Sequence, residues 1–489
     1  MYHAGEPEAR LPNPFGPGVL QELLEHESVT LHSLVALVGL VVYGVASHTF
    51  RQRRHPSAAI AWLISLVLLP YVALPLYLMF GSRKVVVYRG LSHLAPQFDR
   101  ATGAHTAAAS AGQLAAALGL PQAAQFEQLA IHQDGTQALQ CLRSMIDGAE
   151  RTLDLCTFIL GRDALGEEIT QRLMHQARAG VRVRLLIDGI GYYMGGRPEL
   201  AGLAAAGVQV ALFVSPLRSA LRGRTNLRNH RKLVLADGAW LCCGGRNLAA
   251  EYFSAPHGAH RVEQPWVDLS FDLRGELAQQ GQQQFELDWA FATTGQIARR
   301  AITLPLAEAP GSPGGRMVAS GPDQLDDTIY TLIVSGCFTA QSRILAVTPY
   351  LVPEPTLLLA LALAARRGVA VDLLLPRRSN HRLADIARHP ALRELVAAGA
   401  RIWLAPAMVH AKAVLIDEDL ALVGSANLDG RSLFLNYELM VAFHTPGVVR
   451  DFARWIELQR SGAASYQPQP PGLARELLEG LVRWVAFQL

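Results

Sequence analysis

Two long stretches near the start of the chain contain no charged residue. Residues 28–50 include the run LHSLVALVGLVVYGVA, and residues 56–82 include AIAWLISLVLLPYVALPLYLMFG. Each stretch is long enough to cross about 30 Å of hydrocarbon as a helix. Neither shows the polar stripe that a helix on a soluble core presents to water. The pattern therefore predicts two transmembrane helices within residues 28–82, the second kinked at Pro70 and Pro75.

The tail before these stretches, residues 1–27, does not have the composition of a secretory signal. Glu22, Glu25 and Glu27 stand where a signal peptide carries basic residues, and a second apolar stretch follows the first. We therefore expect an anchoring hairpin. Basic residues flank it on both sides, so the positive-inside rule does not decide its orientation. They are Arg51, Arg53 and Arg54 in the turn, and Arg10, Arg83, Lys84 and Arg89 outside it.

From about residue 126 onward, helix-like and strand-like patterns alternate. The run GTQALQCLRSMIDGAERTLDLCTFIL predicts an amphipathic helix followed by a strand. The next helix is expected to end at Gly180, before a buried strand over residues 181–187. QSRILAVTPY and PTLLLALALAARRGVAVDLLLP repeat this plan later in the chain. Helices followed by β-branched apolar runs indicate an α/β fold with a largely parallel sheet in each half.

Changes in composition predict the domain boundaries. EAPGSPGG, rich in proline and glycine, is typical of a linker between the two halves. The last residues, LARELLEGLVRWVAFQL, predict an amphipathic helix that either packs on the second domain, which we favour, or lies at a membrane surface. The expected order is a connector over 83–125, a first domain over 126–307, a linker over 308–316, a second domain over 317–467 and the C-terminal helix over 468–489.

The composition changes this picture in three ways. Hydrophobic residues make up 50% of the 489 residues and the mean hydropathy is +0.18, which is high for a soluble enzyme. The net charge of +3 is too small for a protein that binds nucleic acid through its overall charge. The five cysteines form no CxxC pair, so we expect buried thiols in a reducing compartment.

Two short motifs repeat in register. NHRKLVLAD spans residues 229–237 and VHAKAVLID spans residues 409–417, 180 positions later. A single HxKxxxxD motif is weak evidence for a site, but five residue types recurring at five equal offsets indicate an internal duplication. The matched pairs are His230 and His410, Lys232 and Lys412, Asp237 and Asp417, Gly244 and Gly424, and Asn247 and Asn427.

These motifs resemble those of the phospholipase D superfamily and, in detail, those of the bacterial cardiolipin synthases. The resemblance covers nearly the whole chain and rests on SAAIAWLISLVLLP, RLLIDGIG, RNHRKLVLADG, GGRNLAAEY, TPYLVPEP, HAKAVLID and GSANLDGRSLFLNYE. It implies two α-β-α domains packed as a pseudo-twofold pair behind an N-terminal transmembrane hairpin. It also implies a phosphatidyltransferase that needs no cofactor and acts in the bacterial cytoplasmic membrane as a multi-pass protein. We expect its catalytic domains on the cytoplasmic side.

The spacing within each motif suggests how the residues divide their work. In a strand, alternate side chains share a face, so each histidine lies beside the lysine two positions later. His230 and Lys232 can then approach one phosphate from one half, and His410 and Lys412 from the other. The motif includes Asp237 and Asp417 in the catalytic set. The alternation of side chains along a strand, however, points them away from the face of the histidine and lysine. We therefore expect these aspartates to hold the following turn.

Two imidazoles beside one phosphorus can act as nucleophile and as general acid and base. The resemblance implies that His230 is the nucleophile and His410 the acid and base, whereas the sequence alone leaves the two equivalent. We expect the two lysines, Asn247, Asn427 and Ser425 to donate to the phosphate oxygens. Since the lysines neutralise charge, and the His, Cys and carboxylate spacings form no recognisable ligand set, we expect no metal.

Each imidazole also needs a carboxylate to fix its tautomer. Asp268, in QPWVDLSF, and Glu438, in LNYELMV, occupy comparable strands of the two halves. We expect Asp268 to pair with His230 and Glu438 with His410, each within its own half.

Three functions remain open on this evidence. The first is a transferase that makes cardiolipin and glycerol from two phosphatidylglycerol molecules, through a phosphatidyl-histidine intermediate. The second is a hydrolase that uses water as the acceptor, and the third is an inactive membrane scaffold. The expected partners are phosphatidylglycerol, other anionic phospholipids and the membrane, with no nucleic acid and no obligate protein partner. Arginines ahead of the first motif either attract anionic headgroups or form a solvated surface: Arg218, Arg222, Arg224 and Arg228.

Overall fold

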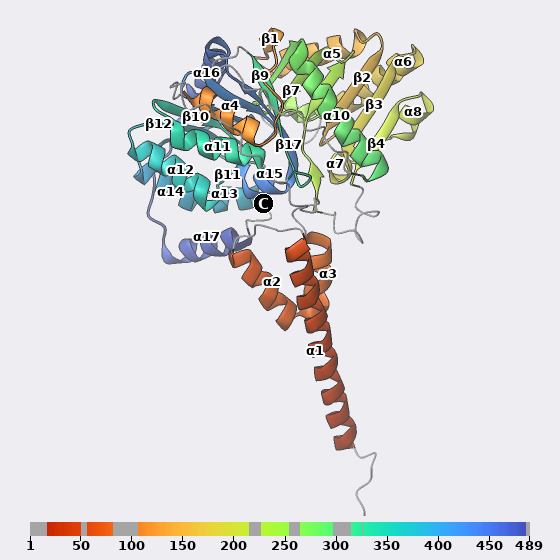
Figure 1. Ribbon diagram of the computed structural model, residues 1–489, viewed down its shortest axis with the longest axis vertical. Coiled ribbons are helices and arrows are strands. Elements are labelled where there is room, and N and C mark those ends of the chain that lie inside the picture. The colour runs from red at the N-terminus through yellow and green to blue at the C-terminus, as the bar shows by residue number, and fades with distance from the viewer. Residues whose placement is uncertain are drawn as a thin grey trace, which may run out of the picture. The chain divides into compact units, whose positions relative to one another are not determined.

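The computed structural model describes residues 17–49, 56–81, 106–214, 226–253, 265–296, 314–324 and 326–485. They form two compact units (Figure 1). The first unit holds the three N-terminal helices, and the second holds all the other elements. Several expectations fall outside the described residues: the tail before residue 17, the arginines of the hairpin turn, most of the linker, and Arg218, Arg222 and Arg224.

The N-terminal unit differs from the predicted hairpin. Its helices are α1 (Pro17–Thr49), α2 (Pro56–Leu68) and α3 (Pro70–Phe80). Among the described residues only α1 is long and apolar enough to cross a membrane, over Thr30–Ser47. The prediction of a second spanning helix is wrong, because the chain leaves the helical conformation at Leu69, with φ −134° and ψ 53°. Pro70 causes this break, since proline disfavours a helical residue before it and has no N–H.

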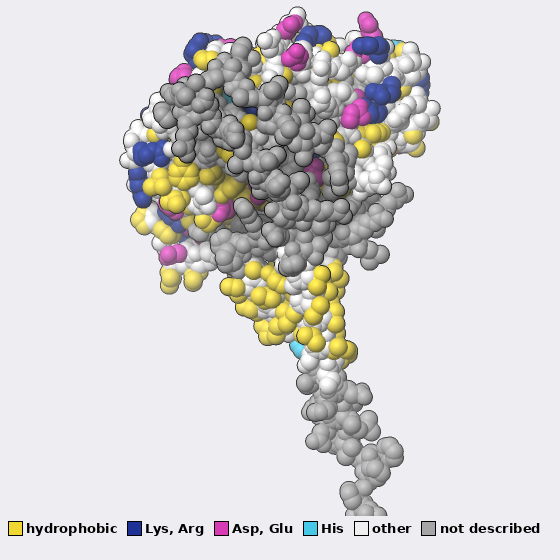
Figure 2. Space-filling view, in the orientation of Figure 1, with side chains coloured by type: hydrophobic (Ala, Val, Ile, Leu, Met, Phe, Trp, Pro, Cys, Tyr) yellow, Lys and Arg dark blue, Asp and Glu magenta, His cyan; other side chains and the backbone are white. Residues whose placement is uncertain are grey.

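The surface of this unit is apolar. Leu66, Ala73 and Tyr77 form its buried centre, and the Trp62 ring lies edge-on to Tyr77 with a centroid distance of 5.2 Å. Large aliphatic side chains on all three helices point outward, and they give this unit its continuous yellow surface in Figure 2. An apolar surface of this extent is suited to lipid or to another apolar partner.

The first half of the second unit is built on a seven-stranded sheet with the order β1-β8-β7-β6-β2-β3-β4. Its strands are β1 (Glu127–Ile131), β2 (Thr152–Thr157), β3 (Arg182–Asp188), β4 (Gln209–Phe213), β6 (Leu233–Ala236), β7 (Trp240–Gly244) and β8 (Ser270–Arg274). Its helices are α5 (Gly135–Asp147), α6 (Ala164–Arg178), α7 (Gly189–Met194), α8 (Ala201–Ala205) and α10 (Glu276–Thr294), with a 3-10 turn at Ala250–Tyr252.

The second half repeats this plan around a larger sheet, with the order β18-β13-β12-β10-β14-β15-β17-β5 and β9 beside β17. Its strands are β5 (Arg228–Asn229), β9 (Gly315–Ser320), β10 (Arg343–Val347), β12 (Ala370–Pro376), β13 (Arg401–Ala405), β14 (Ala413–Ile416), β15 (Leu420–Gly424), β17 (Asn436–Phe443) and β18 (Ala464–Ser465). A separate pair joins β11 (Leu351–Val352) to β16 (Leu428–Asp429). The helices are α11 (Thr328–Thr339), α12 (Pro355–Arg366), α13 (Arg382–Ala387), α14 (His389–Ala397), α15 (Gly430–Phe434) and α16 (Pro446–Arg460).

Both sheets are mixed, whereas the alternation of patterns predicted largely parallel ones. In the first half β2, β3 and β4 run parallel, but β6 is antiparallel to both β2 and β7. The cause is a tight hairpin at Asp237 and Gly238, whose φ values are 54° and 68°. An Asp-Gly pair between two apolar runs is a strong hairpin signal, which a reading based on helix-strand alternation overlooks.

The two halves share one hydrophobic core. A cluster of buried residues includes Phe271 and Phe285 from the first half and Val441, Phe443 and Trp455 from the second. The short strand β5 belongs to the first half in sequence but pairs with β17 of the second sheet. Figure 1 shows β17 between the two halves. The exchange of β5 brings the first motif to the edge of the second domain.

Two segments flank the duplicated domains. Helix α4 (Ala107–Ala117), in the predicted connector, packs Ala107, Ala111 and Ala115 into the core of the second half beside α11. The C-terminal helix α17 (Leu473–Val485) contacts α13, and its buried Glu479 bonds to Arg393 at 2.5 Å. The C-terminal helix therefore packs on the second domain, as expected, and an ion pair between Glu479 and Arg393 forms part of the contact. Leucines of α17 remain exposed, namely Leu473, Leu477 and Leu478.

Candidate active site

The two histidines hold symmetrical positions at the seam between the halves. Each lies just before the strand of its motif, β6 or β14. The His230 N–H donates to the carbonyl of Tyr437 at 2.9 Å, and the His410 N–H donates to that of Val267 at 2.7 Å. Tyr437 precedes Glu438 and Val267 precedes Asp268, so each histidine is attached to the strand that carries the other half's carboxylate.

The expected pairing of carboxylates and histidines is wrong. His230 Nδ1 lies 3.1 Å from Glu438 Oε1, and His410 Nδ1 lies 2.6 Å from Asp268 Oδ2. The pairs therefore cross between the halves. The pairs cross because the backbone around each histidine is hydrogen-bonded to the opposite half. The spacing of residues within one half does not indicate this pairing.

The pair formed by Asp268 and His410 is completely buried. Asp268 also accepts from its neighbour's backbone, the N–H of Leu269, at 2.8 Å. Burial alone would raise the pKa of Asp268, but Lys412 and His410 hold it well below its usual range. Burial, with a smaller contribution from the charge of Lys412, lowers the pKa of His410 to about 3, although Asp268 opposes the shift. His410 is therefore neutral near pH 7, with its Nδ1 directed at Asp268.

The pair formed by Glu438 and His230 has more support and slightly more exposure. Ser425 donates its hydroxyl to Glu438 Oε2 at 2.5 Å, and Asn436 donates to Oε1 at 3.2 Å. Burial also lowers the pKa of His230, against the attraction of Glu438. The His230 side chain is 14% exposed, compared with 5% for His410. Ser425, expected to donate to phosphate, instead fixes a carboxylate in this structure.

Two buried lysines give the site its positive charge. Lys232 Nζ donates to the His230 carbonyl at 2.6 Å, and Lys412 Nζ lies 2.7 and 3.0 Å from the two ring nitrogens of His410. Burial lowers the pKa of Lys232 to about 8 and that of Lys412 to about 7. Lys232 acts electrostatically on His410, and Lys412 acts on His230. The two motifs thus form one electrostatic site, in which a bound anion would restore the lysine charges.

The two motif asparagines differ in their contacts. Asn247 donates to the Tyr252 hydroxyl at 2.8 Å and accepts from the Ile159 N–H at 3.3 Å. Asn427 is buried, and its side-chain oxygen has no hydrogen-bond partner among the described residues. The Asn427 side chain also hydrogen-bonds to Asp429, so neither amide can donate to a phosphate unless its present contact is exchanged.

Aromatic side chains enclose the imidazoles, and the motif analysis missed them. The Phe158 ring lies 5.0 Å from that of His230, and the Tyr252 and Trp266 rings lie 5.1 and 5.4 Å from that of His410. Such rings displace water and so strengthen the electrostatic interactions within the site. The available signal was their position, because each lies next to a quoted motif: CTFIL, GGRNLAAEY or QPWVDLSF.

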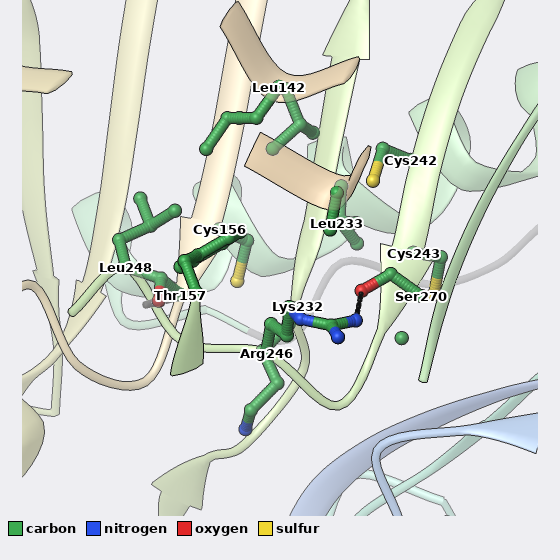
Figure 3. A pocket seen from close by; sticks show the side chains of 14 residues that line it. Leu142, Cys156, Thr157, Lys232, Leu233, Cys242, Cys243, Arg246, Leu248 and Ser270 are labelled. Carbon is green, nitrogen blue, oxygen red and sulfur yellow. Dashed lines mark hydrogen bonds between the residues drawn. The ribbon is translucent and has the colours of Figure 1, made fainter. Parts of the chain in front are cut away.

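A small cavity of about 40 Å³ reaches Lys232 from the side of α5 (Figure 3). Apolar side chains such as Leu142, Leu233 and Leu248 line it, and Arg246 at its edge donates to the Ser270 hydroxyl at 2.7 Å. It is too small for a lipid and contains neither histidine, so the reacting groups lie beyond its Lys232 end.

The motif aspartates have a structural position, but they hold a different segment from the one expected. Asp237 accepts backbone N–H groups from Glu150, Arg151 and Thr152, at 3.0, 2.7 and 2.9 Å. Asp417 likewise accepts from the backbone of residues 341–343. Both have left-handed φ values, 54° and 52°, which aspartate tolerates better than most residues. They therefore hold the hairpin against the start of a neighbouring strand, β2 or β10.

Asp237→Ala is expected to lower the free energy of unfolding by about 1–3 kcal/mol, because three backbone N–H groups lose their shared acceptor and alanine tolerates the left-handed turn less well than aspartate. Burial opposes ionisation, but the three donors outweigh it and hold the pKa of Asp237 below its usual value. This contribution is present above the unfolded pKa and lost as pH falls through the folded pKa. Unfolding of the variant and the wild type, measured in detergent, should therefore converge in acid.

Asp237→Asn is the matched control, because asparagine keeps an acceptor and tolerates the left-handed turn. Its stability should lie between those of the wild type and Asp237→Ala. A large loss of turnover per folded molecule, with stability unchanged, would contradict the structural role.

Comparison with known proteins decides the family. Residues 142–289 and 338–459 match the family model for the cardiolipin synthase, PLD-like domain. Cardiolipin synthase A of Pseudomonas aeruginosa strain LESB58 is 32% identical over 460 residues, covering 90% of this chain and 92% of that protein. This chain is a cardiolipin synthase-type enzyme of the phospholipase D superfamily.

Other similarities support the same placement. Residues 35–82 match the phospholipase D–nuclease N-terminal family. Cardiolipin synthase A of Pseudomonas putida strain W619 is 31% identical over 441 residues, covering 87% of this chain and 89% of that protein. The crystal structure of phosphatidylserine synthase from Haemophilus influenzae Rd KW20 shares the fold, with a TM-score of 0.57 and 14% identity over 78% of this chain and all of that one. The duplicated domains predicted from the paired motifs are confirmed for this superfamily member.

Proposed function

We propose that this enzyme is a membrane phosphatidyltransferase that converts two phosphatidylglycerol molecules into cardiolipin and glycerol. The observation that carries the proposal is the crossed arrangement of two buried histidine–carboxylate pairs with two buried lysines. Two relatives from Pseudomonas, both named cardiolipin synthase A, support it.

In the first half-reaction, the unprotonated Nε2 of His230 attacks the phosphorus of one phosphatidylglycerol. A P–N bond forms while the P–O bond to the glycerol headgroup breaks, in line with the attack. His410, protonated in the substrate complex, gives its proton to the departing glycerol oxygen. Phosphatidyl-histidine and free glycerol result.

In the second half-reaction, the headgroup hydroxyl of another phosphatidylglycerol is the nucleophile. His410, now neutral, accepts the hydroxyl proton while the oxygen attacks phosphorus and the P–N bond breaks. Cardiolipin forms, and the proton on His410 makes the enzyme ready for the next turnover. The low pKa of His410 in the free site favours its role as a base, and an anionic substrate favours its protonation before the first step.

The surrounding side chains orient the two imidazoles and stabilise the negative charge of the phosphoryl group. Glu438 holds Nδ1 of His230 and leaves Nε2 for attack, and Asp268 does the same for His410. Lys232 and Lys412 stabilise the charge on the phosphoryl oxygens in a site that aromatic rings shield from water. Asn247 and Asn427 can join them only after their present contacts rearrange.

A hydrolase with water as acceptor would use the same residues. Enclosure of the imidazoles by Phe158, Tyr252 and Trp266 favours transfer, because it restricts water near the intermediate. An inactive scaffold is disfavoured, since buried lysines and carboxylates cost stability unless their charges are used.

The proposal places the protein in the bacterial cytoplasmic membrane with its catalytic domains on the cytoplasmic side. The helix α1 provides one span, and the apolar α2 and α3 add membrane contact without a second continuous span. Anionic phospholipids are then both the substrate and the surroundings of the site.

The decisive test supplies the purified full-length enzyme with phosphatidylglycerol vesicles alone. We expect cardiolipin and glycerol in a one-to-one ratio, measured by mass spectrometry of extracted lipid and by assay of the aqueous phase. The reaction should run in ¹⁸O-labelled water. Phosphatidic acid carrying ¹⁸O as the main product would show that the enzyme is a hydrolase, and no product of either kind would favour the scaffold.

A further inference from the structure

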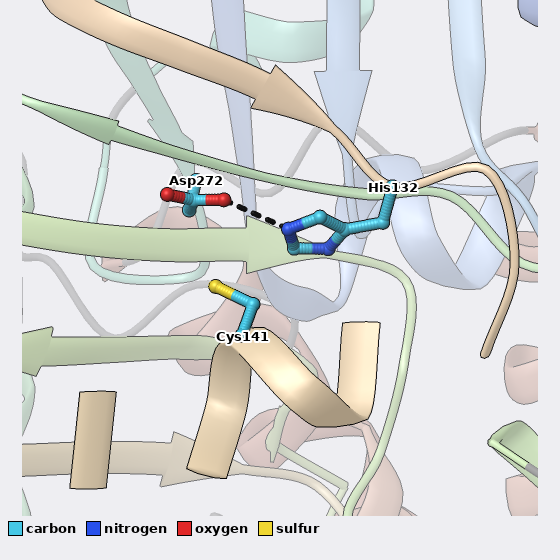
Figure 4. Close-up of side chains that lie close together, drawn as sticks. All are labelled: His132, Cys141 and Asp272. Atoms are coloured by element: carbon cyan, nitrogen blue, oxygen red, sulfur yellow. Dashed lines mark hydrogen bonds and ion pairs between the residues drawn. The ribbon is translucent and has the colours of Figure 1, made fainter. Parts of the chain in front are cut away.

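Three potential metal ligands meet away from the histidine pair. His132 follows β1, Cys141 lies on α5, and Asp272 lies in β8 (Figure 4). One ligand atom from each lies within 4.8 Å of the others. It is the only such group of His, Cys, Asp or Glu side chains among the described residues. No spacing motif in the sequence indicates this group, because the three residues are separated by 9 and 131 positions.

Packing fixes these side chains toward one another. The His132 N–H extends β1 by donating to the Ser270 carbonyl at 2.9 Å, which holds the histidine beside β8. His132 Nε2 lies 2.8 Å from Asp272 Oδ1, and Trp240 Nε1 donates to Asp272 Oδ2 at 2.9 Å. One carboxylate oxygen is thus oriented by the indole while the other faces the histidine and the thiol.

A second thiol adjoins the group. Cys242 lies in β7 directly opposite Asp272 in β8, so their side chains share one face of the sheet. The hydrogen bond with Cys242 and burial raise the pKa of Cys141 above its usual range, while contact with His132 opposes this. The next residue, Cys243, points into the opposite core. The face that carries Cys242 therefore presents two thiols, one imidazole and one carboxylate.

We propose that His132, Cys141, Cys242 and Asp272 bind one divalent cation of the zinc class. Zinc prefers four nitrogen, sulfur and oxygen ligands in a tetrahedron, with ligand atoms roughly 3.3–3.8 Å apart. The ligand atoms of His132, Cys141 and Asp272 already lie within 4.8 Å of one another, and Cys242, opposite Asp272 in the sheet, would supply the fourth ligand. On binding, the proton of each thiol passes to solvent and two Zn–S bonds form, while the cation replaces the hydrogen bond between imidazole and carboxylate.

The position of the cluster gives the metal a structural role. It would join α5 to β7 and β8 and to the segment after β1. Asn247 lies three residues after the end of β7, and Asp268 lies two residues before the start of β8. The bound cation would therefore hold in place the strands that carry the first half's asparagine and the carboxylate of His410.

The test begins with the metal content of purified full-length protein in detergent, measured by plasma mass spectrometry. We expect about one zinc ion per chain, which a strong chelator removes and added Zn²⁺ restores. Replacement with Co²⁺ should give the intense visible bands of a tetrahedral site and a thiolate charge-transfer band. Chelation should lower the melting temperature and reduce turnover of the remaining folded enzyme only partly, because the cluster supports the strands beside Asn247 and Asp268 but supplies no reacting group.

Variants separate this site from adventitious binding. Cys141→Ala, Cys242→Ala and Asp272→Asn should each weaken Zn²⁺ binding by at least about tenfold and reduce the cobalt bands. Cys337→Ala, which removes a buried thiol in the other half, is the matched control and should bind like the wild type. The cobalt spectrum of the wild type decides the question even if a variant fails to fold. Wild-type protein with no stoichiometric metal and no thiolate band would overturn the proposal, and so would metal that is unaffected by all three substitutions.

Discussion

His230→Ala and His410→Ala are each expected to lower cardiolipin formation by about 10³–10⁶-fold, while the protein still folds and inserts in membranes. Each substitution removes one of two groups that act on the same phosphorus. His444→Ala is the control, because it removes a partly buried histidine of the second half that contacts Arg316 and neither carboxylate pair. Turnover should be measured by release of glycerol from phosphatidylglycerol, beside a melting curve for each variant.

The leaving group separates the two roles. A phosphatidyl nitrophenyl ester needs no general acid, so His410→Ala should still release nitrophenol in a burst and keep the phosphatidyl group on His230. The adduct should be located by mass spectrometry at mildly alkaline pH, in the peptide that carries His230. An adduct on His410 in His230→Ala, with none on His230, would reverse the assignment. A burst without any adduct in either variant would refute the two-step mechanism.

Asp268→Asn and Glu438→Gln are expected to lower turnover of phosphatidylglycerol by about 10²–10⁴-fold, because each histidine loses the acceptor that fixes its tautomer. The crossed pairing makes a finer prediction. Asp268→Asn should resemble His410→Ala, with slow turnover of phosphatidylglycerol but nearly normal loading by the nitrophenyl ester. Glu438→Gln should resemble His230→Ala, with slow loading by both substrates.

The control is Asp372→Asn, which alters a carboxylate that accepts from Trp403 and Arg401 far from either motif in sequence. It should leave both half-reactions near the wild-type rate. If Asp268→Asn impaired loading and Glu438→Gln spared it, the carboxylates would act within their own halves, as spacing alone suggested.

The sequence predicted the parts of the site whose signals are local. The helices α5, α6 and α12 follow from apolar periodicity, and the duplicated motifs located both histidines and both lysines. The crossed carboxylates could not be predicted, because the neighbour of His230 is Glu438, 208 positions away on a strand of the other half. The residue pattern of one half predicts which face of the sheet a side chain points to. It does not predict which strand of the other half lies next to that side chain.

Other differences have equally specific causes. The hydropathy of residues 56–82 suggested one continuous span, but a proline effect on the preceding residue divided it at Leu69. Hairpins at Asp237-Gly238 in the first half and at Asp417 in the second, each with left-handed φ, made the sheets mixed. His132, Cys141 and Asp272 come together only because a helix packs on two strands. Packing of this kind leaves no fixed spacing between the residues in the sequence.

The exchange of β5 onto β17, and the matching bridge from Val267 to Val409, bear on how such a protein could arise. A chain with a single half would have a histidine and a carboxylate but could unite them only by associating with a second copy of itself. An ancestor of this kind would have worked only as a twofold dimer. Its activity would have depended on the protein concentration, because only the dimer would contain a complete site. Fusion of two such copies would replace that encounter with a tether, for which short linkers give effective concentrations in the millimolar range. Once the copies were joined, each could mutate separately, and the glycine at 245 opposite the serine at 425 records such a divergence around otherwise matched pairs.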